Sequence, residues 1–182
     1  MGKMLNLLQD GDRRTVGKVA DAVRLAVGKP KYITELMDLL SDPRPEVRMR
    51  AADALEKATV QQADMLAPHK DQLLELTEDA QQSEVRWHLA QIVTRLDLNA
   101  EEIDDLSEVF GRWFRRAASK IVRTAALQAM FDLAQKEPAL LDETLKMLED
   151  GINSPVPALN ARARKLKGPL ERFKASHEAK SL

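Results

Sequence analysis

The sequence contains no cysteine and few residues that break helices or favour sheets. The absence of cysteine excludes disulfides and thiolate metal sites from these 182 residues. Aromatic residues make up only 4%, and the chain has 7 glycines and 8 prolines. Runs of β-branched residues are also rare, which argues against an extensive sheet. Alanine, leucine, glutamate, lysine, arginine and glutamine are abundant and favour helices, so the composition predicts an all-α protein.

Long apolar runs are missing as well. No stretch approaches the ~18 apolar residues that a membrane span requires. The apolar run at the N-terminus is closed by Asp10 and is too short for a secretory signal. We therefore expect a cytoplasmic protein that has no membrane partner.

The net charge is −1, so bulk charge predicts no polyanionic partner. Its distribution is uneven, because residues 1–110 carry 14 basic and 21 acidic side chains, whereas residues 111–182 carry 14 and 8.

A valine–arginine pair recurs along the chain at a nearly constant interval. It occurs as Val47-Arg48, Val85-Arg86 and Val122-Arg123, at steps of 38 and 37 residues. Each pair opens a similar segment: V-R-M-R-A-A-D-A-L, V-R-W-H-L-A-Q-I-V and V-R-T-A-A-L-Q-A-M. A period of this length is typical of stacked helical hairpins. At the fourth position the pair is replaced by Leu159-Asn160.

Proline and glycine residues lie between the apolar-periodic runs and predict where the hairpins join. Ile33, Leu36, Met37 and Leu40 follow helical spacing before one such joint. We expect about four hairpins, each with a first and a second helix, preceded by one helix over 13–27 that covers the first hairpin. The hairpins span approximately 31–60, 68–97, 100–136 and 138–167. Together they form a single domain over 1–174, followed by a flexible tail over 175–182.

The segment D-P-R-P-E-V-R-M-R-A-A-D-A-L at 42–55 resembles the HEAT-repeat, armadillo-like family. The resemblance covers roughly 31–135 well and the flanks loosely. The tetratricopeptide alternative has a 34-residue period and a different signature, and fits less well. The resemblance implies a right-handed α-α superhelix, a HEAT-like solenoid, that acts as a protein-binding scaffold. It further implies that a turn aspartate bonds the helix arginine of the next unit, pairing Asp42 with Arg86 and Asp79 with Arg123. Arg48 is the third arginine of this structural set.

The residues available for catalysis or metal binding are few. Only His69, His88 and His177 titrate near neutral pH, and no nucleophile, phosphate-loop or dinucleotide motif is present. Glu84 and His88 share a helix face, but two ligands do not complete a metal site. We expect a non-catalytic protein that holds no metal and no cofactor.

In HEAT arrays the second helices line the concave surface, where a protein or peptide partner would bind. Aligning the hairpins on the valine–arginine pair places a set of polar residues and one tryptophan off the apolar stripe, so that they should face outward. Trp87 would suit a binding hot spot, or it packs against a neighbouring unit. The candidate partner-binding residues are Arg50, Asp53, Trp87, His88, Gln91, Arg95 and Gln128.

The alternative function is nucleic-acid binding through the basic C-terminal half. Arg112-Trp113-Phe114-Arg115-Arg116 and the basic residues between 162 and 174 combine cations with aromatic rings, a combination that can bind phosphates and bases. The low net charge argues against it. For the chain itself we expect a monomer or a weak homodimer.

Overall fold

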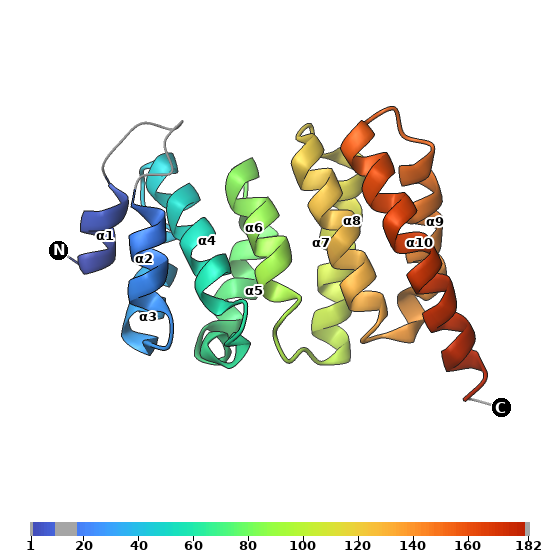
Figure 1. Ribbon diagram of the computed structural model, residues 1–182, viewed down its shortest axis with the longest axis horizontal. Coiled ribbons are helices and arrows are strands. Elements are labelled where there is room, and N and C mark those ends of the chain that lie inside the picture. Colours follow the sequence, from blue (N-terminus) through green and yellow to red (C-terminus); the bar gives the residue numbers. More distant parts are fainter. Residues whose placement is uncertain (1, 10–17, 181–182) are drawn as a thin grey trace. The chain divides into compact units, whose positions relative to one another are not determined.

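The structure is a computed structural model that describes residues 2–9 and 18–180. These residues form ten α-helices and two short 3-10 helices, and no strand occurs among them (Figure 1). The all-α prediction is therefore confirmed. None of the described helices combines the length and the apolar character needed to cross a bilayer.

The chain divides into two compact units, Met1–Asp97 and Leu98–Leu182, called here the N-terminal unit and the C-terminal unit. The helices of the N-terminal unit are α1 (Lys3–Leu8), α2 (Val19–Ala26), α3 (Pro30–Leu39), α4 (Pro45–Thr59), η1 (Ala63–His69), α5 (Lys70–Asp79) and α6 (Ser83–Val93). Those of the C-terminal unit are α7 (Ala100–Arg116), α8 (Lys120–Ala134), η2 (Pro138–Leu140), α9 (Leu141–Ile152) and α10 (Pro157–Glu178).

Local sequence explains where five of the ten α-helices in the described ranges begin. Proline occupies the first turn of α3, α4 and α10, where its fixed φ suits a helix and its missing N–H costs nothing. Helix α7 begins with a capping box, in which the Asn99 side chain and Glu102 satisfy each other's backbone N–H groups. The Ser119 hydroxyl accepts a hydrogen bond from Val122 N at the start of α8.

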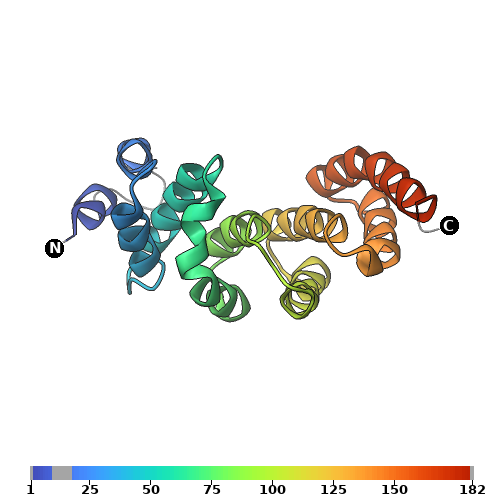
Figure 2. The same cartoon turned by 90° about the horizontal axis from the view of Figure 1, so that it is seen from below.

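Within each unit, the helices pair into hairpins whose second helices pack side by side. The hairpins are α3–α4, α5–α6, α7–α8 and α9–α10, four in number as predicted for the described residues. The second helix α4 contacts α2 and α6, and α8 contacts α10. Figure 2 views the C-terminal unit nearly along its helices, with α8 and α10 in one layer and α7 and α9 in the other. The recurring Val47, Val85 and Val122 are buried at the first turns of α4, α6 and α8.

The two ends of the chain contain more helix than the sequence indicated. Two helices, α1 and α2, stand before the first hairpin, where we expected a single helix over 13–27. Residues 13–17 lie outside the described residues. Both helices pack against α3 and α4, so the covering role is filled by a pair. At the other end, α10 runs to Glu178 and so extends into the segment expected to be a tail.

Candidate interaction surface on the second helices

The recurring arginine closes its own hairpin. Arg48 Nη1 donates to the carbonyl oxygens of Asp42, at 2.7 Å, and Pro43, at 3.1 Å. Arg86 Nε donates to Ala80 O at 2.5 Å. Arg123 Nε donates to Phe114 O at 2.8 Å. The last carbonyls of a helix lack intrahelical partners. The recurring guanidinium therefore fixes the turn between the two helices of each hairpin.

The fourth hairpin keeps this arrangement with a different side chain. Leu159 is fully buried in the place of the valine. Asn160, which stands in the place of the arginine, donates from its amide to Ile152 O at the end of α9. Arg164 Nε in turn donates to Asn160 Oδ1 at 2.9 Å. The Asn160 amide therefore fixes the turn of the fourth hairpin, as the guanidinium does in the other three.

The pairing of Asp42 with Arg86, which the resemblance implied, is not what the structure shows. The Asp42 carboxylate accepts hydrogen bonds from the Arg44 backbone N–H and guanidinium at 2.8–2.9 Å. These bonds hold the pKa of Asp42 below its ordinary value. The link to the next hairpin is made instead by Arg48 Nε, which donates to Gln82 Oε1 at 2.9 Å, while Gln82 Nε2 donates to Pro45 O at 2.8 Å. Asp79 and Arg123 belong to different units, and their pairing stays a prediction.

Three of the candidate partner-binding residues are buried, although we expected them to face outward. The exposed fractions are 1% for Arg50, 8% for Asp53 and 2% for His88. Arg50 Nη1 donates to Leu8 O, at the end of α1, at 2.7 Å. The physical reason is that α4 is flanked by α2 on one side and α6 on the other. Residues beside the apolar stripe therefore face the neighbouring second helix and are shielded from solvent.

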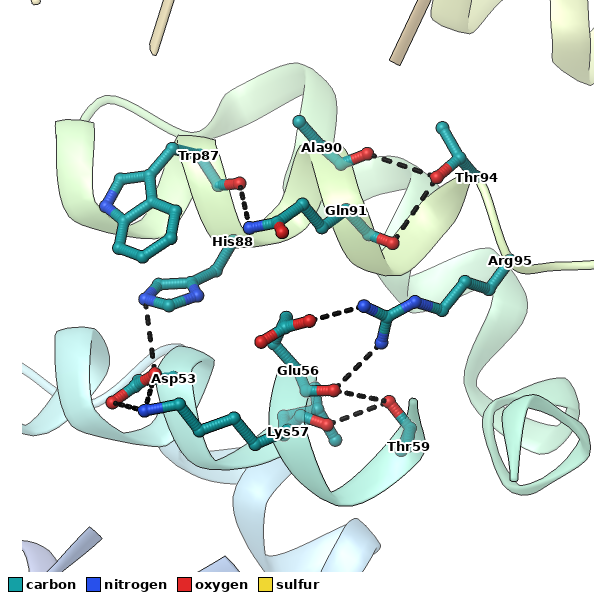
Figure 3. Close-up of polar contacts among 11 residues, drawn as sticks. Asp53, Glu56, Lys57, Thr59, Trp87, His88, Ala90, Gln91, Thr94 and Arg95 are labelled. Atoms are coloured by element: carbon teal, nitrogen blue, oxygen red, sulfur yellow. Dashed lines mark hydrogen bonds and ion pairs between the residues drawn. The ribbon is translucent and has the colours of Figure 1, made fainter. Parts of the chain in front are cut away.

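Two polar contacts join α4 to α6 and to the turn that follows it (Figure 3). His88 Nε2 lies 3.8 Å from Asp53 Oδ1, and the same carboxylate accepts a salt bridge from Lys57 Nζ at 2.8 Å. One turn further along, Arg95 forms an ion pair with the Glu56 carboxylate and donates from Nη1 to Glu56 O at 2.8 Å. The Arg95 and Glu56 side chains are only 22% and 12% exposed. These residues are thus committed to contacts between consecutive hairpins.

Burial determines the charge state of His88. Burial, the largest effect, and the nearby charge of Lys57 both lower the pKa of the imidazole, whereas the charge of Asp53 raises it. Together they bring the pKa from 6.5 to about 4. The ring is therefore neutral at pH 7. Its Nδ1 is buried and has no hydrogen-bond partner among the described residues. A buried, neutral base that faces a carboxylate at 3.8 Å makes the stability of this unit sensitive to acid.

The same residues form the one group in the described ranges that could approach a metal ion. Ligand atoms of Asp53, Glu56 and His88 lie within 4.8 Å of one another. Lys57 and Arg95 already neutralise the two carboxylates. A divalent cation would have to displace both side chains from a cluster whose charges balance, so the arrangement favours a structural network over a metal centre.

The remaining candidates are partly accessible. Trp87 is half-buried, and its ring lies 3.5 Å, centroid to centroid, from the His88 ring. Gln91 Nε2 donates to Trp87 O at 3.3 Å. In the C-terminal unit, Gln128 accepts a hydrogen bond from Arg162 Nη1 at 2.8 Å and donates to Asp132 at 2.9 Å. The structure brings together the candidates on α4 and α6, while Gln128 belongs to the other unit.

One geometric rule covers the contacts in both units. Asp53 and Gln128 occupy the sixth position after the recurring valine, and each faces the third position of the next hairpin, at His88 and Arg162. From the sequence we placed equal positions of successive hairpins side by side, such as Asp53 beside Gln91, and so missed this offset of three residues. The contacting pairs are Asp53 with His88 and Gln128 with Arg162, which are 35 and 34 residues apart in the sequence, three fewer than the repeat period. A search for polar pairs at this separation could have revealed the offset.

Comparison with known proteins identifies the family. No curated protein and no solved structure matches the chain significantly. The HEAT repeat domain family matches residues 5–166, which include the first three hairpins, α9 and the beginning of α10. HEAT repeats generally serve as scaffolds for protein interactions. With valine-anchored hairpins, second helices packed side by side and a family match over most of its length, the chain belongs to the HEAT-repeat family.

Proposed function

We propose that this chain is a non-catalytic module that binds a protein or peptide partner on the outer side of its second helices. The observation that supports this proposal most strongly is the set of polar contacts between consecutive second helices. Because these contacts hold neighbouring helices at a fixed offset, the side chains beyond them form a defined surface in each unit. A surface fixed in advance loses little conformational entropy when a partner binds.

The accessible part of this surface differs from the predicted one. Arg50, Asp53 and His88 are buried and serve the packing of the helices. Trp87 and Gln91 on α6 and Gln128 on α8 remain within reach of a partner. A half-buried tryptophan offers a large apolar contact that costs little side-chain entropy, which suits an interface anchor.

The histidines give no sign of an acid–base site. His88 is buried and neutral. His69 Nε2 lies 3.2 Å from the Thr34 hydroxyl, and His177 lies exposed near the end of α10. The burial of His88 removes from acid–base work the one histidine that lies in the polar cluster of the second helices, which supports a binding role over a catalytic one.

Site-specific photo-cross-linking in the native host tests the proposal. A photoreactive residue replaces Trp87 or Gln128 on the second helices, and, as matched controls, Glu75 on α5 or Asp105 on α7, which are exposed on first helices. We expect discrete adducts from the second-helix positions only. Adducts that form equally from both layers, or only from the first helices, would contradict the proposed surface.

A further inference from the structure

Charge is segregated between the two helix layers of the C-terminal unit. The first helices α7 and α9 carry nine acidic and four basic side chains. The second helices α8 and α10 carry eight basic and three acidic side chains. The two layers therefore have opposite net charges of equal size, about −5 and +5, with histidine neutral.

The second helices of the N-terminal unit show no such excess. Acidic and basic side chains are equal in number on each of α4 and α6. Several of them neutralise one another, as Asp53 and Lys57 do within α4. The positive charge of the second helices is thus a property of α8 and α10, and it does not follow from the repeat itself.

Part of the positive charge on α10 is already neutralised. Lys167 Nζ lies 3.1 Å from a Glu149 carboxylate oxygen, and Lys174 Nζ lies 2.5 Å from Asp142. Both carboxylates belong to α9, so these two lysines hold α10 against its hairpin partner. They are not available to a ligand.

Three other cations on α10 are exposed and lie on its opposite side. Arg162, Lys165 and Arg172 follow i, i+3, i+10 spacing, which places them along one face, away from the buried Leu166 and Leu170. Among the described residues, Arg162 bonds only to the neutral Gln128, and Lys165 and Arg172 form no ion pair. Ten residues of helix extend about 15 Å, the length of about four or five residues of extended peptide.

Helix α8 supplies an apolar neighbour. Ile121 is 61% exposed, the largest exposed fraction among the large hydrophobic residues of the described ranges. It lies seven residues, or about 10 Å of helix, before Gln128 on the same side of α8, and the Gln128–Arg162 hydrogen bond brings Gln128 next to the first of the cations of α10. Ile121 therefore lies beyond Arg162, at the opposite end of the row from Arg172. Ile121, Gln128, Arg162, Lys165 and Arg172 together are called the α8–α10 face.

We propose that the α8–α10 face binds an acidic peptide segment of the partner protein, with carboxylates on Arg162, Lys165 and Arg172 and an apolar side chain on Ile121. This inference rests on the proposed function and specifies the chemistry of its partner. Charge complementarity selects the acidic ligand. Three cations in a row with an exposed isoleucine at one end, over about 25 Å of helix, suit an acidic peptide better than a nucleic acid, whose binding usually depends on more phosphate contacts.

The test measures the fluorescence anisotropy of two labelled ten-residue peptides of glutamates, one with a leucine near its N-terminus and one with a leucine near its C-terminus, because Ile121 lies at one end of the row of cations. The reference peptides carry glutamine in place of glutamate. The test variant combines Arg162→Gln, Lys165→Gln and Arg172→Gln. The matched control combines Arg112→Gln, Arg116→Gln and Lys146→Gln, which removes the same charge from exposed positions on α7 and α9.

We expect the acidic peptides to bind at ~50 mM salt, to weaken as salt rises, and to bind the test variant about tenfold more weakly, or about 1.4 kcal/mol. The control variant should bind the acidic peptides as the wild type does, because it loses the same charge from the first helices. The glutamine peptides should bind neither protein, because they lack the carboxylates. Equal weakening in both variants, no binding of either acidic peptide, or tighter binding of single-stranded or duplex oligonucleotides would overturn the inference. If cross-links from Trp87 or Gln128 persist in any of these cases, the proposed function stands while the acidic-peptide inference fails.

Discussion

Acidification should destabilise the N-terminal unit through His88. The pKa of this imidazole is about 4 in the folded protein, against 6.5 as the ordinary value. Between these two pH values the unfolded chain binds more protons than the folded one, so the free energy of unfolding rises with pH there. The contribution is fully present above pH 6.5 and is lost as the pH falls toward 4. A shift of this size corresponds to about 3 kcal/mol.

The assay compares the wild type with His88→Gln. Urea unfolding is followed by circular dichroism at several pH values between 7 and 4, and His177→Gln, on the exposed end of α10, serves as the matched control. Carboxylates with lowered pKa values, such as Asp42, also lose stabilisation in acid. They are present in all three proteins, so the difference between the curves isolates His88.

We expect the wild type and the His177→Gln variant to lose stability together as the pH falls from 6.5 to 4. The His88→Gln variant should lose up to about 3 kcal/mol less. Titration of the His88 ring protons by NMR gives the midpoint directly. Parallel curves for all three proteins, or a His88 midpoint near 6.5, would refute the argument that burial keeps this ring neutral.

The remaining predictions concern the packing of the C-terminal unit and the buried cluster. Gly151→Ala should lower the free energy of unfolding by about 1–3 kcal/mol, because the new Cβ would lie 2.9 Å from Ala163 Cβ. Gly168→Ala, whose new Cβ meets only a flexible arginine end at 3.3 Å, should be neutral or stabilising by up to about 1 kcal/mol in the same urea titration. Arg123→Ala should cost about 1–3 kcal/mol because the carbonyl near the end of α7 loses its donor, whereas Arg116→Ala at an exposed position should change stability by less than about 0.5 kcal/mol. Micromolar zinc should leave the thermal midpoint unchanged, because the only candidate ligand cluster in the described ranges already has its carboxylates neutralised; a rise in midpoint that the chelator EDTA reverses would contradict this.

The recurrence of one residue pair was enough to predict the fold. Val47, Val85 and Val122 are all buried at equivalent helix starts, because the first turn of each second helix packs into its own hairpin. Leu159 follows the same rule although its neighbour is no longer arginine. A buried position in a repeat is constrained by its immediate surroundings, and a sequence pattern records such constraints well.

The sequence was less informative about the surface. Arg50 and His88 lie beside the apolar stripe, and from spacing alone such residues are expected to face solvent. Their burial depends on how closely one second helix packs on the next, which is a property of neighbouring hairpins. Helix α1 was missed because it has only six residues, too few to show a clear period.

The central claim is that polar residues of the second helices bind one hairpin to the next, and a double-mutant cycle on Glu56 and Arg95 tests it most directly. The variants are Glu56→Gln, Arg95→Met and their combination, each unfolded with urea at pH 7. Because the two side chains are mostly shielded from solvent, we expect a coupling free energy of about 1–3 kcal/mol. A coupling below about 0.3 kcal/mol would mean that these side chains act independently, and that the contact between α4 and α6 does not hold the hairpins together.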